Sequence, residues 1–121
     1  MNIAIITARA GSKSIKNKNV YPVHGKPMIA YPIEAAKAAR RIAKVYVSTD
    51  GLEIARVAEE MGCEIIWRPE ELAGDHVNHG EVIKHAVEQA DSPGLQNVVI
   101  LLGNTVMIDA ELIDEALRLL E

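Results

Sequence analysis

Four cations lie within ten residues near the N-terminus of the chain: Arg9, Lys13, Lys16 and Lys18. Gly11 stands among them between small residues, and a glycine lets the backbone approach a ligand closely. Exposed backbone amides with cations around them make a seat for phosphate groups. The alternative is a solvated basic loop. A strand followed directly by small residues and clustered cations favours phosphate binding over that alternative.

A buried strand is expected to hold this basic loop in place. Residues 3–6 form an apolar run rich in isoleucine, which is typical of a parallel strand covered on both faces. Residues 7–19 then become small, polar and basic without a break. The sequence therefore predicts that the loop leaves the carboxyl end of a core strand.

The rest of the chain alternates between predicted strands and helices. Pro32 either lies in the first turn of a helix beginning near Tyr31 or kinks a longer one. Asp50 and Glu53 are spaced as a capping box for the helix expected at 52–61. Gly62 is expected to end that helix, and Asp109 is expected to cap the helix at 110–121. The expected elements are a short extended piece and turn (21–26), helices at 28–41, 52–61, 81–90 and 110–121, and strands at 44–48, 63–67 and 97–102.

This alternation predicts a parallel sheet covered by helices on both faces. The strand at 97–102 is the most apolar and is expected to be central. A strand order of 3-2-1-4 would place the first and fourth strands side by side. Residues 7–13 and 103–105 would then flank one crevice, and His79 could reach the same edge.

Composition narrows the class of protein. The net charge is −4, whereas a general nucleic-acid binder is usually basic, so the cation cluster more plausibly serves a small anion. We expect one domain, 1–121, with no membrane partner because no apolar run approaches the length of a span. The single cysteine, Cys63, and the lack of a signal-peptide pattern predict a cytoplasmic location.

The basic loop resembles that of the acylneuraminate cytidylyltransferases, the CMP-sialic acid synthetase family. Their entry strand runs into a loop close to P-A-R-G-G-S-K-G-I-x-x-K-N. Thr7, Ala10 and Ser14 depart from it. Residues 25–31, 47–50 and 68–75 also resemble the family, the last through its R-P-x-E-L-A-x-D motif. The loop positions that match are Arg9, Gly11, Ser12, Lys13, Ile15, Lys18 and Asn19.

Two later segments depart from the family pattern. Asn78 and His79 stand where the family usually has a pair of serines that help to hold the base and ribose. Gly103 and Asn104 stand where it reads Q-P, with the Gln beside the base. For the segment with Asn78 and His79, one alternative is plain helix capping. Another, less favoured, is a transition-metal site built from His76, His79 and His85, for which no second ligand cluster is visible.

The resemblance implies a Rossmann-like, three-layer α/β/α fold with a mostly parallel sheet, of the nucleotide-diphospho-sugar transferase type but truncated. The family's catalytic subunit is nearly twice as long, and this chain resembles its N-terminal, nucleotide-binding half. The activity implied is transfer of CMP from CTP to a sialic-acid-like nine-carbon sugar acid, with release of pyrophosphate. The alternatives are a non-catalytic nucleotide-binding module and a related transferase that uses another base or sugar.

The resemblance also implies roles for particular residues. Arg9 and Lys18 are the expected catalytic residues. Magnesium is implied, with ligands from the later half of the family domain and none here. The partners implied are CTP or another nucleoside triphosphate and a sugar acid, and an unfinished sheet edge suggests a homo-oligomer. The expected nucleotide-binding residues are Ala8, Ala10, Gly11, Ser12, Lys13, Asn19, Asn78, His79, Gly103 and Asn104.

Overall fold

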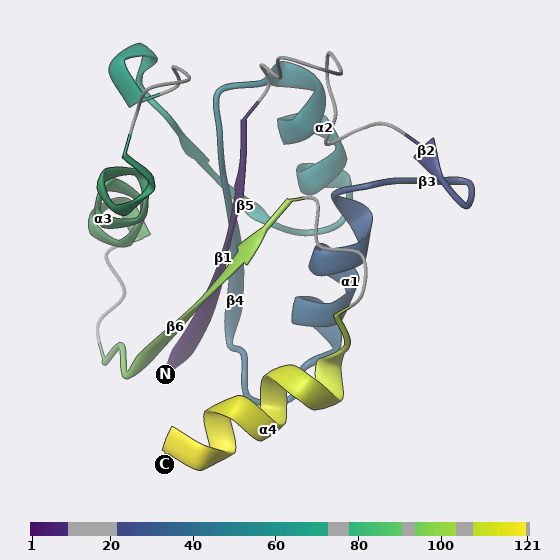
Figure 1. Cartoon of the computed structure of the whole chain (residues 1–121), viewed down its shortest axis with the longest axis vertical. Coiled ribbons are helices and arrows are strands. Elements are labelled where there is room, and N and C mark those ends of the chain that lie inside the picture. The colour runs from purple at the N-terminus through teal and green to yellow at the C-terminus, as the bar shows by residue number, and fades with distance from the viewer. Residues whose placement is uncertain (10–21, 73–77, 91–93, 104–107, 121) are drawn as a thin grey trace.

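The computed structural model describes residues 1–9, 22–72, 78–90, 94–103 and 108–120 (Figure 1). Six strands and four α-helices lie in these ranges, with a 3-10 helix at Glu70–Leu72. Their bounds are β1 Asn2–Ala8, β2 Pro22–Val23, β3 Lys26–Pro27, α1 Ala30–Ala38, β4 Lys44–Thr49, α2 Leu52–Glu60, β5 Glu64–Trp67, α3 His79–Ala90, β6 Asn97–Leu102 and α4 Ala110–Leu120.

The main sheet has four parallel strands in the order β5-β4-β1-β6. In sequence order these are its third, second, first and fourth strands, so the predicted order is confirmed. The expectation that residues 97–102 would be central is wrong. β6 ends the sheet, with β1 as its only strand partner among the described residues, and β1 is central and buried along its whole length. An apolar strand needs its faces covered, which does not require a neighbour on both sides.

Helices cover both faces of the sheet, as predicted. α1, α2 and α4 lie on one face and α3 on the other (Figure 1). Alternate side chains of β1 enter the two cores, with Ile6 facing the three-helix side and Ile5 facing α3. The predicted three-layer arrangement is therefore present. None of the helices within the described ranges is long and apolar enough to cross a membrane.

The first helix settles the position of Pro32. α1 begins at Ala30, so Pro32 lies in its first turn and is buried. A proline is tolerated in the first turn because the amides there have no partner within the helix. The alternative of a kinked helix starting near residue 28 is not observed.

The expected capping box at the start of α2 is wrong. The cap position is Gly51, and it carries no side-chain cap bond. Thr49 Oγ1 instead accepts the N–H of Gly51 at 3.0 Å, and Glu53 pairs with Arg56. Asp50 lies one residue too early, because a capping side chain must directly precede the first helical residue.

The other two expected helix ends are confirmed. Gly62 ends α2 with φ +85°, and the N–H of Cys63 donates to Ala58 O at 3.0 Å, which is a Schellman-type end. Asp109 caps α4, because its Oδ1 accepts the N–H of Leu112 at 2.8 Å.

The β2–β3 hairpin is attached to α1 by side chains. Its turn contains His24 and Gly25, both with positive φ. Lys26 Nζ pairs with Glu34 at 2.8 Å and lies 4.7 Å from the ring centre of Tyr31. The Tyr31 hydroxyl donates to Val23 O. Residues 22–27 therefore form the extended piece and turn that the sequence predicts.

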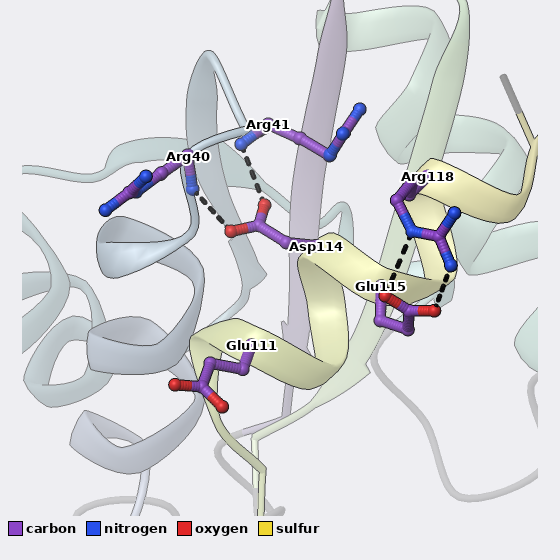
Figure 2. Close-up of a pocket in the computed structure, with 6 residues that line it drawn as sticks. All are labelled: Arg40, Arg41, Glu111, Asp114, Glu115 and Arg118. Atoms are coloured by element: carbon purple, nitrogen blue, oxygen red, sulfur yellow. Dashed lines mark hydrogen bonds and ion pairs between the residues drawn. The ribbon is translucent and has the colours of Figure 1, made fainter.

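The pocket between α4 and the turn after α1 contains a carboxylate that joins them (Figure 2). Asp114 Oδ2 accepts the N–H of Arg40 at 2.9 Å, and Oδ1 accepts that of Arg41 at 2.8 Å. These two backbone bonds lower the pKa of Asp114 below its ordinary value of 3.8. Asp114 thus attaches the last helix to the chain that enters β4.

We predict that Asp114→Asn lowers the free energy of unfolding at neutral pH. A carboxyl whose pKa is lowered by folding stabilises the native state above its unfolded value, and that contribution is lost as pH falls through the folded pKa. Chemical denaturation at neutral pH and at acidic values down to about pH 2 measures the free energy of unfolding of both proteins. The difference between the native chain and the variant should shrink as the pH falls.

Glu111→Gln is the matched control, since it removes the same charge from the same helix and the same pocket. We expect its stability to change less than that of Asp114→Asn. Equal losses from the two variants would show that helix charge, and not the two backbone bonds, carries the effect.

Candidate functional site

The carboxyl ends of the four parallel strands lie together at one end of the sheet, which is called this edge below (Figure 1). Thr7 on β1 is level with Ser48 on β4 and with Leu102 on β6. The N–H of Gly103 donates to Thr7 O at 2.9 Å, so the ends of β1 and β6 are joined. The predicted adjacency of the first and fourth strand ends is therefore confirmed, whereas the site roles of Ala8, Arg9 and Gly103 stay predictions. Seven other predicted site residues lie outside the described residues: Ala10, Gly11, Ser12, Lys13, Lys18, Asn19 and Asn104.

Arg68 belongs to this edge, although the sequence reasoning did not select it as a site residue. Its N–H donates to Thr49 O at 2.8 Å, and Nη2 donates to Ser48 O at 3.3 Å. Arg68 directly follows β5 and opens the motif that resembles the family. A cation at the end of a parallel strand was the signal that could have identified it.

Two charged side chains from other strand ends act on Arg68 here. Burial lowers the pKa of the Arg68 guanidinium, the carboxylate of Asp50 opposes that shift, and the positive charge of Arg9 adds to it. Arg9 follows β1 and Asp50 follows β4. These three described residues, two cations and one carboxylate, carry a net positive charge, which suits an anionic ligand.

Polar atoms without partners lie on the α3 side of the same edge. Ser48 Oγ and Arg68 Nε are buried and have no hydrogen-bond partner within the described part of the chain. Ser48 is two residues after Tyr46 and Arg68 two after Ile66, and both of those side chains enter the core beneath α3. Buried polar atoms of this kind normally bind water or a ligand. His85 Nδ1 on α3 is in the same condition.

The start of α3 brings the two predicted contact residues next to this edge. Asn78 is the helix cap, because its Oδ1 accepts the N–H of Gly80 at 2.7 Å and its backbone oxygen accepts that of Glu81 at 3.0 Å. His79 is the first residue of α3, two residues before the predicted start. Its Nε2 lies 3.1 Å from Thr7 Oγ1.

The described residues contain no group of three or more His, Cys, Asp or Glu side chains that could hold a metal ion. His79 and His85 are on α3, whereas Asp75 and His76 lie outside the described ranges. Cys63 is buried, and burial raises the pKa of its thiol to about 11, so it remains protonated at neutral pH.

A family model described as cytidylyltransferase matches residues 3–121. N-acylneuraminate cytidylyltransferase of Escherichia coli O18:K1:H7 is 47% identical over 85 residues, covering 70% of this chain and 20% of that protein. Pseudaminic acid cytidylyltransferase of Campylobacter jejuni serotype O:2 is 31% identical over 118 residues, covering 95% of this chain and 51% of that one. The resemblance described from the motifs is therefore confirmed, although the chain spans about half or less of these curated relatives.

Solved structures match the fold. A CMP:2-keto-3-deoxy-manno-octonic acid synthetase complexed with CTP aligns with a TM-score of 0.79 at 24% identity, covering 97% of this chain and 46% of that one. A cytidylyltransferase from Leptospira borgpetersenii aligns with a TM-score of 0.75 at 20% identity, covering 98% and 48%. The expected α/β fold with a mostly parallel sheet is confirmed.

We predict that Asn78→Ala costs about 1 kcal/mol of stability, because α3 loses the side-chain acceptor for its first turn. Asn78→Asp keeps an acceptor oxygen and is expected to stay close to the native value. Urea denaturation of the three proteins measures both effects. If Asn78→Ala unfolds at the native midpoint, the cap makes no contribution, and a ligand contact would be the better account of Asn78.

Proposed function

This chain belongs to the cytidylyltransferase family, and from that premise we propose that it forms the nucleotide-binding part of an enzyme transferring CMP from CTP to a sialic-acid-like nine-carbon sugar acid. The observation that carries the proposal is the position of Arg9. It directly follows the buried central strand, and its charge acts on Arg68 at the same edge. The similarity to sugar-acid cytidylyltransferases supports the choice of CTP and of an acidic sugar.

In the proposed reaction a hydroxyl oxygen of the sugar attacks the α-phosphorus of CTP. A new phosphorus–oxygen bond forms, the bond between the α-phosphorus and the bridging oxygen breaks, and pyrophosphate leaves with that electron pair. The hydroxyl proton is released. Negative charge grows on the leaving group, so the main tasks of the protein are positioning and charge neutralisation.

The residues are assigned to these tasks as follows. Arg9 binds the triphosphate and stabilises charge on the departing pyrophosphate, and Lys18 adds a second cation. The positive charge of Arg9 acts on Arg68 and helps to lower its pKa, and two cations that repel each other favour an anion at this edge. Asn78 and His79 contact the nucleoside from the start of α3. The phosphates are lined by the backbone from Ala8 through Ala10, Gly11, Ser12 and Lys13, with Asn19 on a phosphate or sugar oxygen and Gly103 and Asn104 on the base side.

Magnesium is part of the proposal only through the family resemblance. When bound, it would neutralise phosphate charge. The described residues contain no cluster of His, Cys, Asp or Glu for it, and we assign it no ligand among them. A cytoplasmic location also remains a prediction.

A base panel separates this proposal from its alternatives. Calorimetric titration with CTP, ATP, GTP and UTP, each with magnesium, is expected to show preference for CTP. Preference for another base would indicate a related transferase. Binding of CTP without turnover of a sialic-type acid would favour a non-catalytic module. No binding of any nucleotide would contradict the proposal for this chain.

We predict that Arg9→Ala weakens CTP binding by at least about tenfold, since hydrogen bonds to charged groups are worth about 1.5–3 kcal/mol. CMP binding should change less, because CMP lacks the two outer phosphates. Arg56→Ala is the matched control, as Arg56 is an exposed arginine on α2 that pairs with Glu53. Equal affinity of native and Arg9→Ala proteins for CTP would remove Arg9 from the site.

We also infer that this chain self-associates through the outer side of α4. Ile113 and Leu117 face the core, whereas Leu112, Leu119 and Leu120 are 56%, 72% and 68% exposed. Apolar surface of this kind favours an interface. The number of subunits is not assigned.

Light scattering is expected to give a mass above that of one chain. Leu119→Lys with Leu120→Lys should return it to one chain without loss of helix content. Leu52→Lys, at a side chain that is 79% exposed on α2, is the control and should leave the mass unchanged. A single-chain mass for the native protein would rule out the interface.

A further inference from the structure

One side-chain hydrogen bond joins the central strand to the start of α3. Thr7 Oγ1 and His79 Nε2 are 3.1 Å apart, although the two residues are separated by 72 positions in sequence. Thr7 is only 6% exposed, whereas His79 is an exposed residue. The buried hydroxyl therefore holds a ring that remains accessible at the edge where Arg9 and Gly103 lie.

The hydroxyl is itself held firmly. Thr7 lies in β1 with a strand on each side, level with Ser48 and Leu102. Its backbone oxygen also accepts the N–H of Gly103. Thr7 lies near the carboxyl end of β1, but it is paired with a strand on each side. It cannot follow a moving ring, so the bond restricts the imidazole and not the strand.

The bond also determines which ring nitrogen of His79 is available to hydrogen-bond a ligand. A neutral imidazole has one donor nitrogen and one acceptor nitrogen. Because Nε2 is engaged by Thr7, Nδ1 is the ring nitrogen left for a ligand. If the hydroxyl donates to Nε2, Nδ1 carries the proton and is a donor. If the hydroxyl accepts, Nδ1 is an acceptor. Thr7 thus fixes the orientation of the His79 ring, and the direction of this bond sets the hydrogen-bonding role of Nδ1.

We propose that Thr7 is a positioning residue that presents His79 Nδ1 to the nucleoside part of the bound nucleotide. This inference rests on the proposed function and adds Thr7 to the residues that control it. Thr7 and His79 are both positions at which the chain departs from the motifs that it otherwise resembles. A proline in place of Thr7 has no hydroxyl, so the departure at Thr7 is what permits the bond to His79.

The test compares Thr7→Val, which keeps the branched shape but lacks the hydroxyl, with Thr7→Ser, which keeps the hydroxyl. Removing a bond worth about 1 kcal/mol should weaken CTP binding about fivefold in Thr7→Val. Thr7→Ser should bind like the native chain. Adding Thr7→Val to His79→Ala should cause no further loss, because Thr7 acts through the ring.

The ¹⁵N chemical shifts of the His79 ring supply a readout that a purely structural role would not move. In the native chain they should report a predominant tautomer and a bonded Nε2, unlike those of His24, an exposed histidine in the hairpin turn. Thr7→Val should shift them toward the His24 pattern. This comparison within the native spectrum remains decisive even if Thr7→Val fails to fold.

The outcomes separate the two levels of the proposal. If the native chain binds CTP and Thr7→Val binds it with the same affinity, the positioning role alone is overturned. His79 shifts equal to those of His24 in the native chain would overturn the bond itself. No nucleotide binding by the native chain would overturn the proposed function and the ligand role of His79 with it.

Discussion

Burial of β1 on both faces and along both sides is the constraint on which the rest of the structure depends. All seven of its residues are buried, and β4 and β6 occupy its two sides. An unpaired polar group in such a strand is costly. Its two polar side chains are accordingly bonded, with Asn2 Nδ2 donating to Arg41 O and Thr7 Oγ1 bonded to His79 Nε2. The Asn2 bond holds the turn after α1 at the amino end of β1, and the Thr7 bond holds the start of α3 at its carboxyl end.

The two ends of the sheet therefore have different chemistry. At the amino end, Asn2 and Asp114 both bind backbone groups of the turn after α1, which stabilises the junction of α1, α4 and β4. At the carboxyl end, charged and polar atoms from separate strands gather without complete pairing, including Arg68 Nε and Ser48 Oγ among the described residues. Among the described residues, the amino end thus has side chains bonded to backbone, and the carboxyl end has buried polar atoms without a partner. This arrangement is expected of a framework that carries a binding site.

The errors of the sequence reasoning have local physical causes. Asp50 was expected to cap α2, but β4 continues to Thr49 and the helix begins at Leu52, so the cap position falls on Gly51. The strand at 97–102 was expected to be central because of its apolar content. Apolar content reports only that the faces of a strand are covered and carries no information on its neighbouring strands. Arg68 was not selected, since its role depends on Asp50 and Arg9, which lie 18 and 59 positions away in sequence. Each error concerns either one residue of register or a relation between distant segments.

Hydrophobic periodicity, turn residues and the basic loop motif were sufficient by themselves to determine the class of fold, the strand order, most helix ends and the family, because these depend on local patterns repeated along the chain. Only the tertiary structure decided that Thr7 bonds to His79, that Arg68 joins Arg9 and Asp50, and that Asp114 attaches α4 to the turn after α1. Those relations arise when parallel strands and the helices packed on them bring together side chains distant in sequence. No local pattern encodes a distance between them.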